Sequence, residues 1–208
     1  MPHLLHIDAS FRLEGSVSRG VAATFRDSWP GTVTHRDLGR EPLPHLSEPL
    51  FTSGFTPAEG YTAEQKEAAA LRDTLIDELL SADAYLFAVP MYNYGVPSAF
   101  KAWIDHIFVV GQTVGVEPSP VAGRPATLVL SKGGAYGPGT PKEGWDFSEP
   151  YLVKILSEVL ELDVHVITAE LTLADTTPQM ESLRGLAAES LARAHEAARL
   201  RAGRLALV

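Results

Sequence analysis

The sequence predicts a three-layer α/β/α sandwich around one parallel sheet of five strands. Two observations carry this prediction: short apolar runs that do not alternate with polar residues, and stretches of helical periodicity between those runs. Apolar runs without alternation are typical of strands that are buried on both faces. Helices between such strands imply parallel crossovers, so helices are expected on both faces of the sheet.

The first part of the chain predicts a strand, a loop, a helix and a second strand. Residues 2–9 are an apolar run, residues 10–18 are a polar loop, and residues from about 19 to 28 have a helical pattern. Residues 32–36 are rich in β-forming side chains and predict the second strand. Residues 38–61 contain several prolines and glycines with little periodicity, which predicts a long surface excursion.

The middle of the chain contains the clearest helix. Thr62 and Gln65 form a capping-box signature, and apolar residues then recur at helical spacing through Ser81. Residues 84–89 predict a buried strand, and residues 90–97 predict a loop bracketed by prolines. The helix after this loop has a broad apolar face formed by Phe100, Trp103, Ile104, Ile107 and Phe108.

The last part of the chain predicts two more strands, each followed by a helix. Residues 126–130 are a buried strand, and a glycine-rich loop follows over residues 131–146. Ser148 is expected to cap the next helix, and residues 164–168 predict the fifth strand. Residues 177–201 predict a final helix, with threonine as its N-cap and proline at its first position.

Five strands fit the sheet order 2-1-3-4-5 of the flavodoxin-like fold better than the six-stranded dinucleotide-binding fold. Ligands of such sheets bind at the carboxyl ends of the strands. The loops after the first, third and fourth strands are therefore the predicted site. Because no repeat, low-complexity tract or linker interrupts the chain, we expect a single domain over residues 1–208.

Composition excludes several classes of function. The net charge of −9 does not supply the basic surface that nucleic-acid binding needs. The chain has no cysteine, which excludes disulfides, thiolate nucleophiles and thiolate metal sites. No apolar run approaches the ~20 residues of a membrane span, and the N-terminus lacks the features of a signal peptide. We therefore expect a cytoplasmic protein.

The first loop contains Ser10, Ser16, Val17 and Ser18 and leads into a helix. Free N–H groups and the helix dipole favour an anion there, so this loop is a candidate phosphate site. The glycine patterns of nucleotide-hydrolysing P-loops and of dinucleotide-binding folds are absent. The alternative is that Ser16 and Ser18 only cap the helix.

The other two loops have the composition of a pocket for a flat heteroaromatic ligand. Together they offer aromatic surface, an amide, and glycines that let the backbone approach a ligand closely. The residues are Pro90, Met91, Tyr92, Asn93 and Tyr94 in one loop, and Ser131, Lys132, Gly133, Gly134, Tyr136 and Trp145 in the other. Ordinary packing of the tyrosines and a simple turn at the glycines are the alternatives.

No metal site is predicted. His3 and His6 are three residues apart on a strand, so they point to opposite faces and do not share a metal. His106 lies among apolar helix neighbours, and His165 alternates with valines, which favours structural positions for both. A nucleophile elbow of the G-x-S-x-G type is also absent.

Five segments of the sequence, taken together, form a pattern that can be compared with known families. They are HIDASFRLEGSVS, RDLGREPLPHL, PMYN with the P-S-x-x-K-x-W-x-D helix that follows it, LVLSKGGAYG, and EPYLVKIL. With them, nearly the whole chain resembles the bacterial FMN-dependent NADH:quinone oxidoreductases and azoreductases of the flavodoxin-like superfamily. The PMYN segment with its helix is the most specific part of this resemblance.

The resemblance implies bound FMN, with NADH or NADPH as the electron donor. It implies that Ser10 and residues 16–18 hold the FMN phosphate, that residues 91–94 lie along the isoalloxazine ring, and that residues 131–134 meet its pyrimidine edge. It further implies two-electron, ping-pong hydride transfer to a quinone or azo compound. No catalytic side chain is needed, because the cofactor carries the chemistry.

The resemblance also implies a homodimer, for which Trp103 and Ile107 are candidate contacts, with core packing as the alternative. Val114 stands where many relatives have an aromatic residue beside the flavin, and residues 111–116 replace a longer insert, which favours a wider substrate pocket. Three other functions remain open. They are a flavodoxin-type electron carrier, a flavin-free binding protein with this fold, and a reductase of a specialised nitro or nitrogen–nitrogen substrate.

Overall fold

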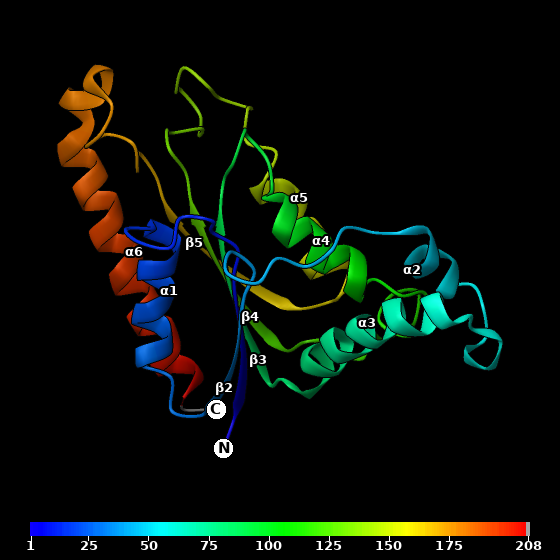
Figure 1. Ribbon diagram of the computed structural model, residues 1–208. Coiled ribbons are helices and arrows are strands. Elements are labelled where there is room, and N and C mark those ends of the chain that lie inside the picture. Colours follow the sequence, from blue (N-terminus) through cyan, green and yellow to red (C-terminus); the bar gives the residue numbers. More distant parts are fainter. Residues whose placement is uncertain (207–208) are drawn as a thin grey trace.

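Five strands run parallel in one sheet, in the order β2-β1-β3-β4-β5 (Figure 1). The computed structural model describes residues 1–206. The strands are β1 (His3–Asp8), β2 (Thr32–Asp37), β3 (Ala84–Pro90), β4 (Pro125–Ser131) and β5 (Asp163–Ala169). This order confirms the flavodoxin-like sheet predicted from the sequence.

Helices cover both faces of the sheet: α1 and α6 pack on one face, and α3, α4 and α5 on the other (Figure 1). They are α1 (Val17–Asp27), α2 (Glu48–Ser53), α3 (Ala63–Ser81), α4 (Ser98–Ile107), α5 (Glu149–Lys154) and α6 (Arg184–Leu205). Short 3-10 turns occur at Ala58–Gly60 and Pro178–Leu183, and a π-helical turn at Ile155–Val159. Within residues 1–206, no helix combines the length and apolarity that crossing a bilayer requires.

Burial differs between the central and the edge strands. Every residue of β3 is buried, and β1 and β4 are buried except at their first residues. The edge strand β2 has no fully buried residue, and β5 alternates between exposed and half-buried positions over most of its length. The apolar runs therefore indicate strands covered on both faces for β1, β3 and β4, whereas the similar run in β5 lies at an edge.

The core between the sheet and α4 is built around aromatic side chains. Trp103 is fully buried, with its ring centroid 5.5 Å from that of Phe87 and 5.3 Å from that of Phe100. Ile107 is fully buried in the same cluster. Both side chains belong to the interior of a single chain, so core packing, and not a subunit interface, is their role.

Three helices differ from the sequence predictions at their boundaries. α1 begins at Val17, slightly earlier than expected, because Ser16 already has the extended backbone of an N-cap. The excursion over residues 38–61 contains α2, and the last helix begins as a 3-10 turn, so α6 starts only at Arg184. Helix ends with prolines and few apolar residues give the weakest periodic signal.

Two expected capping hydrogen bonds are absent. Ser148 and Thr177 occupy N-cap positions, but neither hydroxyl makes a capping bond. At the start of α5, the carboxylate of Asp146 accepts hydrogen bonds from the N–H groups of Ser148 (2.9 Å) and Glu149 (3.0 Å) instead. A charged carboxylate is a stronger acceptor than a hydroxyl, so Asp146 takes the capping role.

Replacing Thr62 with alanine is expected to lower the free energy of unfolding by about 1 kcal/mol. The Thr62 hydroxyl accepts from the Gln65 N–H (3.2 Å), and the Gln65 side chain accepts from the Thr62 N–H (3.0 Å), which confirms the capping box. Urea unfolding measures the loss. The control is Thr74→Ala, in the middle of the same helix, which removes no cap and is expected not to destabilise. Equal midpoints for Thr62→Ala and the parent protein would contradict the prediction.

Candidate functional site

A cavity of about 220 Å³ opens at the carboxyl ends of β1, β3 and β4. Its walls come from the loops after these strands and from a segment after β5. The lining residues are Ser10, Arg12, Gly15, Ser16, Val17, Pro90, Met91, Tyr92, Ser131, Gly133, Thr172 and Leu173. The structure therefore brings together the three loops that the sequence selected.

The N-terminus of α1 meets this cavity without a side-chain cap. Ser16 is the N-cap residue, but its hydroxyl makes no capping hydrogen bond and lies 3.3 Å from the hydroxyl of the buried Ser18. The first N–H groups of a helix have no acceptor within the helix, and the helix dipole adds partial positive charge at that end. This end of α1 therefore offers hydroxyls and N–H donors to an anion such as a phosphate group.

Ser10 is fixed from three directions. Its hydroxyl lies 3.1 Å from the hydroxyl of Tyr92 and accepts from the N–H of Arg12 at 3.2 Å. Its carbonyl oxygen accepts from the Arg19 guanidinium at 2.6 Å. Tyr92 thereby ties the second loop to the first, and both are held at a fixed distance across the cavity.

Arg19 and Asp37 form a bidentate ion pair behind the first loop, with N–O distances of 2.7 and 2.5 Å. The Asp37 carboxylate also accepts from the N–H of Gly39 at 3.0 Å. Burial favours the neutral acid, but the Arg19 guanidinium outweighs it and holds the pKa of Asp37 below its ordinary value. Sequence reasoning missed this pair, because Arg19 on α1 and Asp37 at the end of β2 are far apart in the sequence and meet only in the folded chain.

The second loop makes a tight turn in strained backbone. Tyr92 and Gly95 exchange two backbone hydrogen bonds, of 3.1 and 2.9 Å, with Asn93 (φ 49°) and Tyr94 (φ 67°) between them. Positive φ at both central residues is the geometry of a type I′ turn. Asparagine tolerates this geometry, whereas a residue such as tyrosine adopts it at a cost of about 1–3 kcal/mol. The Asn93 side chain is exposed and lies outside the cavity lining.

Tyr94 belongs to an aromatic cluster with two residues of the third loop. Its ring lies edge-on to Tyr136 and to Trp145, with centroid distances of 6.2 and 5.3 Å. Its hydroxyl accepts from the ammonium of Lys142 at 2.8 Å. The aromatic surface expected of the third loop is present, but Tyr94 and Tyr136 lie beside the cavity lining and not within it.

In the third loop, Gly133 and Lys132 face different cavities. Gly133 lines the cavity, and within residues 1–206 no hydrogen bond uses the N–H of Gly133 or of Gly134. Lys132 extends into a neighbouring cavity of about 560 Å³, where its ammonium pairs with Asp146 (2.6 Å) and Glu149 (2.5 Å). Burial disfavours the ammonium, yet these two carboxylates hold the pKa of Lys132 above its ordinary value.

Lys132 is a predicted cofactor-binding residue, and it does not line the 220 Å³ cavity. Its side chain is engaged by carboxylates, and its N–H donates to the carbonyl of Ala169 at 2.9 Å, so it offers the cavity neither charge nor amide. Periodicity does not distinguish a lysine that faces a ligand from one that faces Asp146, because that choice depends on how the long loop folds back.

A fourth segment, after β5, completes the wall and was missed by sequence reasoning. Thr172 donates its N–H to the carbonyl of Lys132 (3.0 Å), and Leu173 donates to that of Gly133 (3.3 Å), so this segment packs on the third loop. Neither residue belongs to a glycine-rich or aromatic pattern that would have indicated it. Val114 is half-buried against the core and does not line the cavity.

These residues fit the parts of a flavin mononucleotide. The uncapped end of α1 with Ser16 and Ser18 suits a phosphate, the Pro90–Tyr92 segment supplies an apolar wall, and the free N–H groups of Gly133 and Gly134 suit the polar edge of a ring. A parallel 2-1-3-4-5 sheet with such a cavity at its switch point defines a flavodoxin-like protein of the flavin-nucleotide-binding class.

Comparison with known proteins narrows the class to a family. Residues 2–194 match a family model described as a flavodoxin-like fold. An FMN-dependent NADH:quinone oxidoreductase of Frankia casuarinae is 47% identical, over 97% of this chain and 99% of its own. The enzyme of the same name from Streptomyces avermitilis is 45% identical, over 99% and 98% of the two chains. The chain belongs to the FMN-dependent NADH:quinone oxidoreductase family.

Solved structures share the fold over the full length. An azoreductase from Bacillus anthracis strain Sterne matches with a TM-score of 0.81 at 24% identity, covering 98% of this chain and 100% of that one. An FMN-dependent NADH-azoreductase from Bacillus anthracis strain Ames Ancestor, in complex with FMN, also gives 0.81, at 22% identity and 99% and 100% coverage. At these identities the likeness establishes the flavodoxin-like fold.

Proposed function

We propose that this protein is an FMN-dependent NADH:quinone oxidoreductase, as its relatives are named. The observation that carries the proposal is the uncapped N-terminus of α1, where Ser16 shares one cavity with Met91, Tyr92 and Gly133. Identity of 47% over nearly the whole chain supports the same chemistry. Bound FMN would supply the two-electron hydride chemistry between NADH and the acceptor.

The role proposed for the residues of this chain is to bind FMN and to fix its orientation. We assign the phosphate to Ser10 and to residues 16–18, whose hydroxyls and N–H groups gather at the start of α1. The ring is assigned to the Pro90–Tyr94 segment, and its polar edge to Ser131, Gly133 and Gly134. The two free glycine N–H groups are positioned donors for negative charge at that edge.

Donor and acceptor are proposed to use the same open side of the ring in turn, which gives ping-pong kinetics. The aromatic cluster of Tyr94, Tyr136 and Trp145 offers flat apolar surface for both. Quinones are the first choice of acceptor, from the names of the relatives. Azo compounds are the second, from the names of the structural neighbours. We place the reaction in the cytoplasm, because that is where its donor NADH is found.

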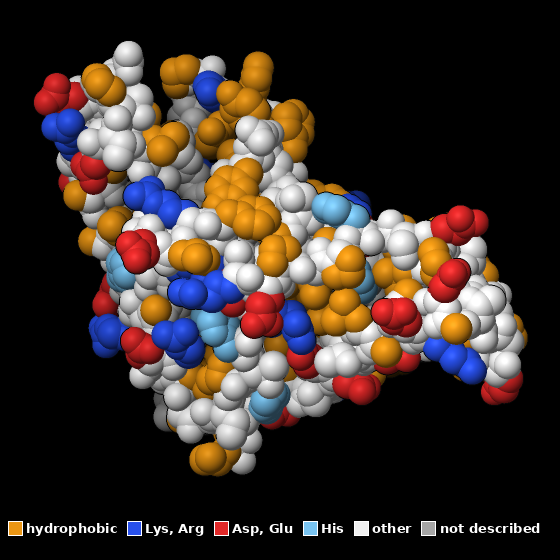
Figure 2. Space-filling view, viewed as in Figure 1, with side chains coloured by type: hydrophobic (Ala, Val, Ile, Leu, Met, Phe, Trp, Pro, Cys, Tyr) orange, Lys and Arg blue, Asp and Glu red, His pale blue; other side chains and the backbone are white. Residues whose placement is uncertain are grey.

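A homodimer is proposed from the apolar surface around α2 and the end of α4. The exposed side chains of Leu46, Phe51, Phe55 and Val110 surround a hollow of about 210 Å³ there. Figure 2 shows hydrophobic side chains gathered where α2, α3 and α4 meet. Contiguous apolar surface of this kind marks interaction sites. Light scattering of the FMN-loaded protein tests it: twice the chain mass is expected, and a monomer would contradict it.

The visible spectrum of the purified protein tests the function. The protein is incubated with FMN, desalted, and mixed anaerobically with NADH. Retained flavin that bleaches with NADH and recovers its colour on adding a quinone supports the oxidoreductase. Retained flavin that NADH does not bleach favours an electron carrier, and a protein that retains no flavin contradicts the proposal.

Replacing Asn93 with alanine is expected to weaken FMN binding about 3- to 10-fold, the value of one ordinary hydrogen bond. The variant Asn93→Gly separates two causes, because glycine keeps the positive φ of the turn and removes only the amide. Fluorescence titration with FMN measures both variants. Loss of affinity in both supports an amide contact with the ring, and unchanged affinity in both would show that the ring lies elsewhere.

A further inference from the structure

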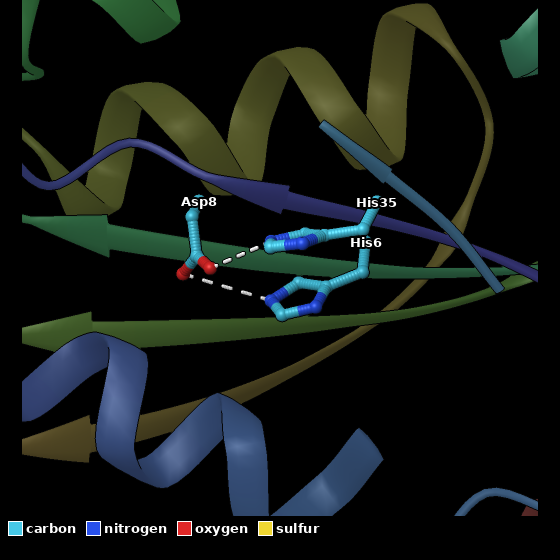
Figure 3. A group of neighbouring side chains, drawn as sticks. All are labelled: His6, Asp8 and His35. Carbon is cyan, nitrogen blue, oxygen red and sulfur yellow. Dashed lines mark hydrogen bonds and ion pairs between the residues drawn. The ribbon is translucent and has the colours of Figure 1, made fainter. Parts of the chain in front are cut away.

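A second group of side chains lies on the sheet face that α1 covers, and none of its members lines the cavity (Figure 3). It consists of His6 and Asp8 on β1 and His35 on β2. His6 and Asp8 are two residues apart and therefore share a face, and His35 is the direct register partner of His6. The sequence comparison of His6 with His3 alone did not reveal this group, because His35 arrives through strand pairing.

The three side chains converge on one point. The Nε2 atom of His35 lies 2.9 Å from Oδ2 of Asp8, and the Nε2 atom of His6 lies 3.6 Å from Oδ1 (Figure 3). The two imidazole rings stack, with centroids 4.5 Å apart and planes 22° apart. All three donor atoms lie within 4.8 Å of one another.

Part of this group lacks hydrogen-bond partners. His6 is 1% exposed, and within residues 1–206 neither of its ring nitrogens makes a hydrogen bond, nor does Oδ1 of Asp8. A buried imidazole carries at least one N–H, and leaving such a group unpaired costs about 1–3 kcal/mol. The unpaired imidazole of His6 therefore lies 3.6 Å from an unpaired carboxylate oxygen of Asp8, and such buried unpaired groups call for a partner.

Two arginines lie close to this group. Arg19 lies 3.4 Å from Asp8, but its guanidinium makes shorter contacts with Asp37, at 2.5 and 2.7 Å, and with the carbonyl oxygen of Ser10, at 2.6 Å. Arg40 also pairs with Asp37, at 3.2 Å, from an exposed position.

Burial raises the pKa of Asp8, but contacts with His35, His6 and Arg19 outweigh it and hold that pKa below its ordinary value. Burial, and to a smaller extent the nearby Arg26, lower the pKa of His6.

We propose that His6, Asp8 and His35 form a binding site for a divalent transition-metal ion, Zn²⁺ in the first instance. Two imidazoles and one carboxylate suit Zn²⁺ and other borderline metals, whereas Ca²⁺ and Mg²⁺ prefer oxygen ligands alone. Ligand atoms about 2.0–2.1 Å from a tetrahedral zinc lie about 3.3–3.4 Å from one another. The two histidine–carboxylate separations are 2.9 and 3.6 Å, and the two histidine nitrogens lie within 4.8 Å of each other, so a metal ion would take the place of the hydrogen bond between His35 and Asp8. The side chain of His35 is 36% exposed, which leaves an entry path and room for water as a fourth ligand.

This site is independent of the proposed oxidoreductase function, and its role is structural. It joins β1 to β2 directly before the loop that contains Ser10, so bound metal stiffens the support of the cavity and contributes no chemistry to it.

The test is titration of the FMN-loaded, tag-free protein, stripped of metal with a chelator and desalted. Isothermal titration with Zn²⁺ is expected to show one saturable site per chain. Co²⁺ is expected to give visible ligand-field bands at wavelengths where oxidised flavin does not absorb. Flavin content, measured in the same samples, shows that any change in metal binding is separate from loss of the cofactor.

His35→Ala is the decisive variant, because its half-exposed side chain can be removed without opening the core. We expect it to weaken Zn²⁺ binding by more than the roughly 10- to 100-fold that loss of a supporting partner costs at metal sites. The matched control is His165→Ala, an exposed histidine on β5, which leaves Zn²⁺ binding unchanged. No saturable binding to the parent protein, or equal binding to the parent and to His35→Ala, would overturn the proposal. Asp8→Asn is expected to weaken Zn²⁺ binding as well, and unchanged Zn²⁺ binding in this variant would also overturn the proposal.

Discussion

Replacing Ser16 with aspartate is expected to weaken FMN binding at least about 100-fold while leaving the fold as stable as before. The hydroxyl of Ser16 lies in the cavity with no capping bond, so it is free to donate to a phosphate. A hydrogen bond to a charged group contributes about 1.5–3 kcal/mol, which alone corresponds to roughly 10- to 150-fold in affinity. The new carboxylate adds repulsion toward the phosphate at the same point.

Stability and binding separate in this variant because aspartate is as good an N-cap as serine, and negative charge at a helix N-terminus is favourable. The matched control is Ser28→Asp, which adds the same charge at the C-cap of the same helix. That change should lower stability slightly, because the C-terminal end of the helix dipole carries partial negative charge. It should leave FMN binding unchanged. Fluorescence titration and thermal unfolding are measured on both. Unchanged FMN affinity in Ser16→Asp would show that the FMN phosphate does not bind at the start of α1.

The sequence was sufficient to predict the sheet order and the three loops of the cavity. Its central strands are short apolar runs without alternation, which is the pattern of a parallel sheet covered on both faces. Prolines at positions 90 and 97 mark where β3 ends and α4 begins. Because the carboxyl ends of parallel strands meet at one edge, predicting the strands also predicts which loops converge. Local pattern and global topology agree here, so periodicity was enough.

What the sequence did not predict depends on contacts between distant residues. The Arg19–Asp37 pair, the turn of Lys132 toward Asp146, and the meeting of His35 with His6 all follow from strand register or from the path of a long loop. No spacing along the chain encodes those distances. The positive φ of Tyr94 was not predicted either, because tyrosine rarely adopts that backbone conformation and the sequence therefore gives no signal for it.

Gly39→Ala is expected to weaken FMN binding at least about tenfold, or about 1.4 kcal/mol, although Gly39 does not line the cavity. A Cβ atom on Gly39 would lie far inside van der Waals contact with the carbonyl oxygen of Ser10 and 2.7 Å from a guanidinium nitrogen of Arg19. That carbonyl is the group through which Arg19 holds Ser10. The backbone of the first loop must therefore move, at a cost of about 1–3 kcal/mol in stability.

Gly31→Ala is the control that separates this effect from simple destabilisation. Its Cβ would clash as severely, with the carbonyl oxygen of Pro2 and with Nε1 of Trp29 at 2.8 Å, but at the amino ends of the same two strands. Both variants should unfold at lower temperature, and only Gly39→Ala should lose FMN affinity, because only its clash reaches the loop of Ser10. Titration with FMN well below both unfolding transitions makes the comparison. Equal affinity losses in the two variants would mean that FMN binding follows overall stability and does not depend on how Gly39 and Arg19 position Ser10.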